Sequence, residues 1–287
     1  MGSGMDSGAY GSEDMKKRPR GRVVKDWIPD QPGAWVMALA PALAGLVVGG
    51  LSADSVWLFV LWALCYCFQF TAARWLKSRF ARRYMPPMAG YGVVLAVCGV
   101  PFVAMNLDVL RWAPVYMVLA ALSFLAAWMR RERSLWGNAV AVVASTLMAT
   151  VVASYGPRNT LHVMLPATAV MMSFAFALFQ FGSVLFVKTM IRERGSRAYL
   201  AASIVWHAVL FAAVTWWVGG VTGELGLSGW IPIQFMWMEL AAVWLLARAV
   251  ALPWIGARRR VRPVVVGLVE MASSLLVFVA VVAYVMW

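Results

Sequence analysis

Basic residues fall almost entirely on alternate sides of nine long apolar runs in this 287-residue chain. Twenty-three of the 25 lysines and arginines lie on one set of sides, and only Arg111 and Arg158 lie on the other. Apolar runs of this length match the hydrocarbon core of a bilayer. Lysines and arginines beside membrane spans are enriched on the cytoplasmic side. The sequence therefore predicts a polytopic membrane protein with a cytoplasmic N-terminus and an external C-terminus.

The predicted spans are helices, because lipid offers the backbone no hydrogen-bond partners and these runs are too long and continuously apolar for strands. We expect an all-α transmembrane bundle of about nine spans that forms a single domain over residues 23–287. Residues 1–22, rich in glycine, serine and charge, are predicted to be a disordered cytoplasmic tail. The spans are expected near residues 34–52, 55–74, 88–106, 112–129, 138–154, 162–187, 199–219, 229–251 and 263–287.

The net charge of +13 would suggest a nucleic-acid partner in a soluble protein. Here the charge lies in short segments beside the spans, where topology and anionic lipid headgroups explain it, so we expect no nucleic acid. The last basic group is Arg248, Arg258, Arg259, Arg260 and Arg262, which we place on the cytoplasmic side. The candidates for contact with anionic headgroups are Arg82, Arg83, Arg192 and Arg194.

Three ionisable side chains lie well inside the spans, away from the basic groups and the span ends: His207, Glu239 and Glu270. Charge in hydrocarbon is costly, so such residues usually face a cavity or a partner. At about 1.5 Å of rise per residue, His207, Glu270 and Gln180 all lie roughly 10–12 Å from the cytoplasmic surface. Glu239 is nearer the midplane. These depths predict one polar pocket that opens towards the cytoplasm.

Hydroxyl groups accompany two of these residues at helical spacing. Ser203 precedes His207 by one turn, and Ser273 and Ser274 follow Glu270 by one turn, so they share a face. One interpretation is a proton-titrating or cation-binding pocket in which His207 changes charge near neutral pH. The alternative is that each group bonds a neighbouring helix and only stabilises packing.

Other motifs narrow the choice of function. The pair Gly45-x-x-x-Gly49 allows close approach of another helix, which we interpret as packing within the molecule rather than dimerisation. The sequence has no Walker loop, G-x-G-x-x-G, H-E-x-x-H or C-x-x-C motif. We therefore expect no metal site and no cofactor.

The N-terminal segment from Trp27 to Met37 (WIPDQPGAWVM), followed by Ala40-Pro41, resembles the signature of the YwiC-like membrane proteins. That family is expected to carry a Pro-x-Gln-His-Gly-Ala-Trp pattern at the start of its first span. The segments 77–87 and 188–195 are also similar to it. The resemblance implies a multi-pass protein of a bacterial cytoplasmic membrane without an assigned activity. The matching motif positions are Pro29, Gln31, Gly33 and Trp35, whereas Pro32 stands where the family has histidine.

Three functions are compatible with these features. We favour a transporter-like or small-molecule-binding protein, because of the polar set and of interrupted helices such as Gly99-Val100-Pro101. The nine-helix plan is also similar to UbiA-type prenyltransferases, which hold magnesium with aspartates in the loops after spans 2 and 6. Those loops here contain no aspartate, and Glu193 is their only acid. A non-catalytic membrane assembly factor is the third possibility.

Overall fold

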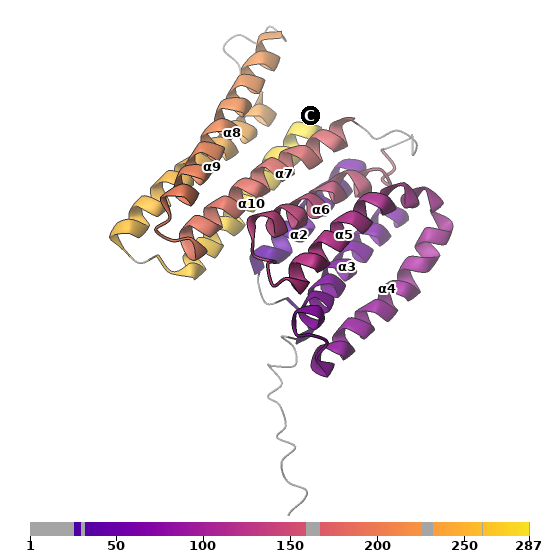
Figure 1. Cartoon of the computed structure of the whole chain (residues 1–287). Helices are drawn as coiled ribbons and strands as arrows, with labels where there is room; N and C mark the ends of the chain where they lie inside the picture. Colours follow the sequence, from indigo (N-terminus) through magenta and orange to yellow (C-terminus); the bar gives the residue numbers. More distant parts are fainter. Residues whose placement is uncertain (1–25, 30–31, 159–166, 225–231, 260, 287) are drawn as a thin grey trace, which may run out of the picture.

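The computed structural model describes residues 26–29, 32–158, 167–224, 232–259 and 261–286, and these residues form an all-α bundle (Figure 1). The predicted tail 1–22 and the motif residue Gln31 lie outside the described residues. Eight of the helices are long and apolar enough to cross a membrane, and Gly33–Gly49 is a shorter apolar helix. The helices are α2 (Pro32–Gly49), α3 (Ala53–Lys77), α4 (Met85–Met105), α5 (Ala113–Trp128), α6 (Leu135–Ala153), α7 (Ala167–Val187), α8 (Arg197–Glu224), α9 (Ile233–Arg258) and α10 (Pro263–Met286).

Each predicted span corresponds to one of these helices, but two helices extend five or more residues beyond their predicted ends. Helix α8 continues to Glu224, five residues beyond its predicted end at residue 219. Helix α9 continues to Arg258, seven residues beyond its predicted end at residue 251. A π-helical turn, Lys188–Arg192, also extends α7. The extension of α9 places Arg248 well inside a helix rather than at its end.

The basic connections lie together at one end of the bundle. Lys77, at the end of α3, forms an ion pair of 2.7 Å with Glu132 in the α5–α6 connection. The Nζ of Lys188, just after α7, donates to the carbonyl of Arg133 in that same connection at 2.7 Å. These two contacts bring together the basic segments that follow α3, α5 and α7.

At the opposite end of the bundle, hydrogen bonds to backbone carbonyls join the connecting segments. Ser52 caps α3 by accepting from the N–H of Ser55 at 2.9 Å, and its hydroxyl donates to the carbonyl of Tyr155 at 2.7 Å. The N–H of Arg158 donates to the carbonyl of Gly49 at 3.0 Å. These bonds connect the α2–α3 turn to the end of α6.

Helices α2, α6, α7 and α10 form the centre of the bundle, with α3, α4 and α5 on one side and α8 and α9 on the other (Figure 1). Helix α4 packs mainly on α3, so it is the outermost helix of its side. Helix α9 packs between α8 and α10. The C-terminal helices α7–α10 therefore form a contiguous group in which side chains from four helices can meet.

The closest contact in this centre is between α2 and α6. A Cβ on Gly45 would collide with the carbonyl of Ala149, and one on Gly49 would lie 2.6 Å from the carbonyl oxygen of Ala153. Small residues allow membrane helices to approach until their backbones touch. The prediction that the Gly45-x-x-x-Gly49 pair packs within the molecule is confirmed.

This contact predicts a graded loss of stability on substitution. Gly49→Ala should lower the free energy of unfolding by about 1–3 kcal/mol, because the added methyl group forces the backbones apart. Gly219→Ala is a matched control in α8, where nothing lies within 4 Å of the new methyl. Unfolding in detergent, followed by tryptophan fluorescence, measures both variants. Equal stability of the two would contradict the close α2–α6 contact.

Candidate functional site

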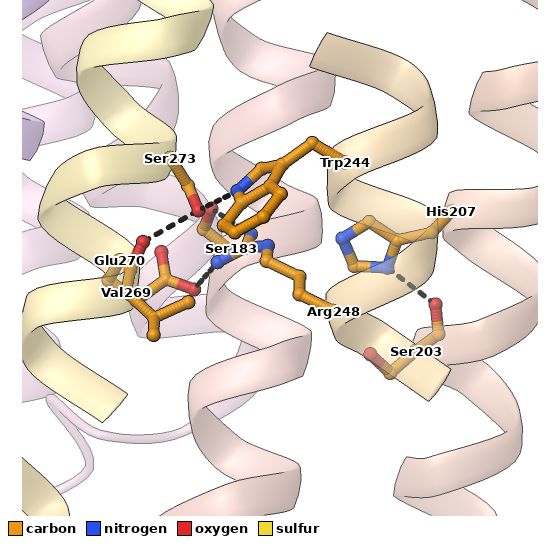
Figure 2. Close-up of polar contacts among 8 residues, drawn as sticks. All are labelled: Ser183, Ser203, His207, Trp244, Arg248, Val269, Glu270 and Ser273. Carbon is orange, nitrogen blue, oxygen red and sulfur yellow. Dashed lines mark hydrogen bonds and ion pairs between the residues drawn. The ribbon is translucent and has the colours of Figure 1, made fainter. Parts of the chain in front are cut away.

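A buried ion pair between α9 and α10 is the centre of the candidate site (Figure 2). Nη1 of Arg248 donates to Oε1 of Glu270, and Nη2 donates to the hydroxyl of Ser183 on α7 at 3.0 Å. The guanidinium also lies over the ring of Phe186, 4.6 Å from its centroid. Arg248 is 3% exposed and Glu270 is 8% exposed. Three helices therefore converge on one buried cation.

The pair lies well inside the helices that carry it. Arg248 is ten residues from the end of α9 at Arg258, and Glu270 is seven residues from the start of α10 at Pro263. At about 1.5 Å per residue, these separations are roughly 15 Å and 10 Å. The charges therefore lie within the apolar part of the bundle, nearer its basic end.

A second pair of bonds orders the surroundings of Glu270. The indole Nε1 of Trp244, on α9, donates to the hydroxyl of Ser273 at 2.9 Å. That hydroxyl donates in turn to the carbonyl of Val269 at 2.6 Å. Trp244 and Arg248 are one turn apart on α9, and Glu270 and Ser273 are one turn apart on α10. The two helices are thus joined by two adjacent polar contacts.

His207 approaches the pair from α8. One ring nitrogen, Nδ1, lies 2.7 Å from the carbonyl oxygen of Ser203, and the ring is directed towards Arg248 (Figure 2). A Cβ on Gly182 would lie 3.0 Å from Nε2 of His207, so this glycine makes room for the imidazole. Within the described part of the chain, Nε2 of His207, the hydroxyl of Ser203 and Nε of Arg248 are buried without a hydrogen-bond partner.

A small cavity lies beside the pair, between α2, α7 and α10. Its space holds no more than about one water molecule. Ser183, which accepts from Arg248, lines this cavity as well as the ion-pair cluster. The lining residues are Val36, Ala40, Phe176, Phe179, Gln180, Ser183, Ser274 and Val277.

Gln180 belongs to the cavity and not to the ion pair. Its amide nitrogen donates to the carbonyl of Met37 at 3.1 Å, and its amide oxygen accepts from Ser145 at 3.2 Å. Gln180 therefore links α7 to α2 and to α6. Of the predicted pocket, the structure brings Glu270 and His207 into one cluster and places Gln180 beside the cavity one turn from Ser183.

Glu239 does not join this cluster. Its carboxylate accepts from the hydroxyl of Thr215 on α8 at 3.1 Å, where both helices are partly exposed. Nine residues separate it from Arg248 on α9, which is about 13 Å along the helix. The structure therefore separates Glu239 from the other ionisable residues.

The placement of Arg248 among the cytoplasmic loop residues is wrong. Its guanidinium is buried because Glu270 and Ser183 satisfy two of its donor groups inside the bundle. The signal in the sequence was the apolar run 249–255, which continues α9 beyond Arg248. Pro253 lies inside this helix and does not end it.

The segment that carries the family signature is anchored at the basic end. Arg83 donates to both carboxylate oxygens of Asp26, from Nε at 2.7 Å and from Nη2 at 2.8 Å. Nε1 of Trp35 donates to the carbonyl of Pro29 at 3.0 Å, whereas Gly33 has no close neighbour that a side chain would meet. These motif residues thus lie apart from the Arg248–Glu270 pair.

Within the described ranges, no three His, Cys, Asp or Glu side chains come together as possible metal ligands. The polar cluster instead combines one guanidinium, one carboxylate, one imidazole and several hydroxyl groups. Such a set can bind a small polar solute and can take up or release a proton.

Comparisons with known proteins find relatives of this chain in bacteria. The family model described as YwiC-like protein matches residues 28–153, which include α2–α6. A protein of Haemophilus influenzae named as uncharacterized is 26% identical over 260 residues, 88% of this chain and 95% of that protein. Uncharacterized protein YwiC of Bacillus subtilis is 30% identical over 188 residues, 65% of this chain and 76% of that protein. No solved structure matches the chain.

The buried pair predicts a non-additive effect on stability. Arg248→Met alone and Glu270→Leu alone should each cost about 3–5 kcal/mol, because each leaves an uncompensated buried charge. The double variant should unfold within about 1 kcal/mol of the original protein, since two apolar side chains replace both charges.

Denaturant unfolding of the three variants in detergent measures this coupling. Glu239→Gln is the matched control. It removes a carboxylate that contacts α8 and lies outside the cluster. If the loss of unfolding free energy in the double variant equalled the sum of the losses in the two single variants, the two side chains would not form a pair.

Proposed function

The chain belongs to the YwiC-like family of polytopic membrane proteins, and we propose that it carries a small solute across the bacterial cytoplasmic membrane in company with a proton. The N-terminus and the basic loops are proposed to face the cytoplasm, in accordance with the charge asymmetry. Arg248 and Glu270 are the proposed solute- and proton-coupling site.

One observation carries this proposal: a buried ion pair in the membrane-spanning part of the bundle, surrounded by polar atoms that have no partner. Isolated charges within a span are costly and usually mark solute pathways or proton relays. A pair that only stabilised packing would not require the unused donor and acceptor atoms of Arg248, His207 and Ser203. These atoms are the groups that an incoming solute would satisfy.

The side chains have different proposed roles. Glu270 takes up and releases the proton, because a carboxylate is neutralised by a proton whereas a guanidinium keeps its charge in proteins. His207 is a second titratable group beside Arg248 and assists this exchange. Glu239 is left out of the coupling site because it lies about 13 Å away along α9.

The cavity lined by Gln180, Ser183 and Ser274 marks the proposed direction of the pathway. It touches the ion-pair cluster through Ser183 and extends towards α2. A carrier alternates between states, and a cavity this small corresponds to a closed state in which the solute site is packed. We propose that separation of α10 and α7 from α2 enlarges this space towards the basic end.

We also propose that anionic lipid headgroups bind at the basic end. Arg192 and Arg82 are exposed there and remain the better candidates. Arg194 donates to the carbonyl of Gly256 at 2.8 Å, which gives it a structural role between the α7–α8 connection and α9. Arg83 is occupied by its ion pair with the N-terminal segment.

Reconstitution in liposomes that contain a pH-sensitive dye tests the proposed function. Small amines, sugars and carboxylates are added outside in turn, and the internal pH is followed. At least one class should drive proton movement, and Glu270→Gln should slow it by about ten-fold or more, because the coupling proton has no acceptor.

Glu239→Gln serves as the matched carboxylate control and should keep the original rate, and protein-free liposomes report the passive leak. Size-exclusion profiles establish that each variant is folded before it is compared. Proton movement that persists unchanged in Glu270→Gln would remove Glu270 from the coupling site. Failure of every solute class to move protons would refute the carrier function.

A further inference from the structure

We infer that the transported solute is a small monoanion with a carboxylate-type head, which binds Arg248 while Glu270 takes up one proton. This inference rests on the proposed carrier function and adds the substrate class and the stoichiometry. It follows from the fixed positive charge of Arg248 and from the negative charge of Glu270, which a proton can neutralise.

The charge balance of the cluster selects the class of solute. Arg248 stays cationic, whereas Glu270 is neutralised when it accepts a proton. An arriving anion can therefore replace the carboxylate of Glu270 on Arg248, and the cluster keeps its net charge of zero. A cation that bound Glu270 would leave the guanidinium buried and uncompensated, which is strongly unfavourable.

Titratable groups on the neighbouring helices do not alter this balance. Helix α9 presents Arg248 to Glu270, and α7 presents the hydroxyl of Ser183. Helix α8 contributes His207 on the far side of Arg248, and α2 has no titratable residue between Pro32 and Gly49. Glu270 is thus the one carboxylate in the described cluster that can exchange its charge for a proton.

The donor geometry also fits a carboxylate. A guanidinium offers five N–H groups in a planar fork and binds carboxylates through two parallel bonds. In the described structure Nη1 and Nη2 of Arg248 have partners, whereas its Nε is buried without one. Nε2 of His207, whose ring is directed towards Arg248 (Figure 2), and the hydroxyl of Ser203 one turn away on α8 are also without partners and can serve a second polar group of the solute.

The size of the solute follows from the packing. The ring of Phe186 covers one face of the guanidinium, and Trp244 is held beside it by Ser273. The adjoining cavity holds no more than about one water molecule. A compact anion can enter with modest separation of the helices, whereas a large one requires a much wider opening.

The proton balance of one cycle is simple. Glu270 accepts a proton from water on the side where the anion enters, and its carboxylate leaves Arg248 as the solute head takes its place. On the other side the solute leaves, Glu270 releases the proton to water and the ion pair forms again. One proton and one monoanion move together, so the cycle transfers no net charge.

Calorimetry on the purified full-length protein tests this inference with acetate as the probe. Acetamide is the neutral probe of the same shape, and methylammonium is a cation of similar size. Titrations in two buffers with different ionisation enthalpies measure the protons taken up on binding. We expect acetate to bind with about one proton taken up, and the other two probes to bind at least about ten-fold more weakly, since only acetate meets the charge of Arg248.

Two variants separate charge exchange from a structural role. At pH 7.5, Glu270→Gln should bind acetate about ten-fold more tightly than the original protein and without proton uptake, because Arg248 no longer has an internal anion. Arg248→Gln should lose acetate binding. The measurement of proton uptake on the original protein decides the question even if a variant does not fold.

The contrary results are distinct from failure of the carrier proposal. Preferential binding of methylammonium or acetamide, or no carboxylate binding at any pH, would overturn the substrate class. Acetate binding without proton uptake would overturn the exchange of charge with Glu270. If the liposome assay still showed proton movement dependent on Glu270, the carrier function would stand with a different solute. A net electrical current that accompanies acetate transport would overturn the one-to-one stoichiometry of proton and anion.

Discussion

Burial of the Arg248 guanidinium is the constraint on which the C-terminal half of the bundle depends. A charge cannot be placed among apolar helices unless its partners are placed with it. Glu270 and Ser183 supply those partners from α10 and α7, so three helices must keep a common register. The adjacent hydrogen bond from Trp244 to Ser273 also requires a fixed register between α9 and α10. Specific bonds rather than apolar attraction determine how these helices face one another, because lipid solvates apolar surfaces as well as another helix does.

The remainder of the bundle supports this cluster through close packing. Gly45 and Gly49 bring the backbone of α2 against α6, and Gln180 connects α7 to both of these helices. The same α7 carries Ser183 one turn further on, so the rigid centre and the charged cluster share a helix. Gly182 lies on that turn and makes room for His207 from α8. The partnerless atoms of Arg248, His207 and Ser203 thus lie at the junction between a tightly packed centre and the peripheral α8–α9 pair.

Much of the fold could be predicted from the sequence, but the neighbours of the charged residues could not. Apolar length located the nine long helices of the described residues, and the spacing of Gly45 and Gly49 correctly indicated a close contact within the molecule. Arg248 was misplaced because the positive-inside rule describes arginines near span ends, whereas α9 continues for ten residues beyond Arg248. The separation of Glu239 from Glu270 could not be foreseen, because depth alone does not say which helices touch. The orientation in the membrane and the roles of the site residues stay predictions.

The exchange of charge at Arg248 is tested most directly by measuring the protonation state of Glu270. Infrared difference spectroscopy between the original protein and Glu270→Gln reports that state. We expect an ionised carboxylate at neutral pH, paired with Arg248, that converts to a carboxylic acid when acetate is added. A carboxylic acid already present at neutral pH without acetate would contradict the ion pair. A carboxylate that did not change on addition of any small anion would contradict the exchange of charge between Glu270 and the solute.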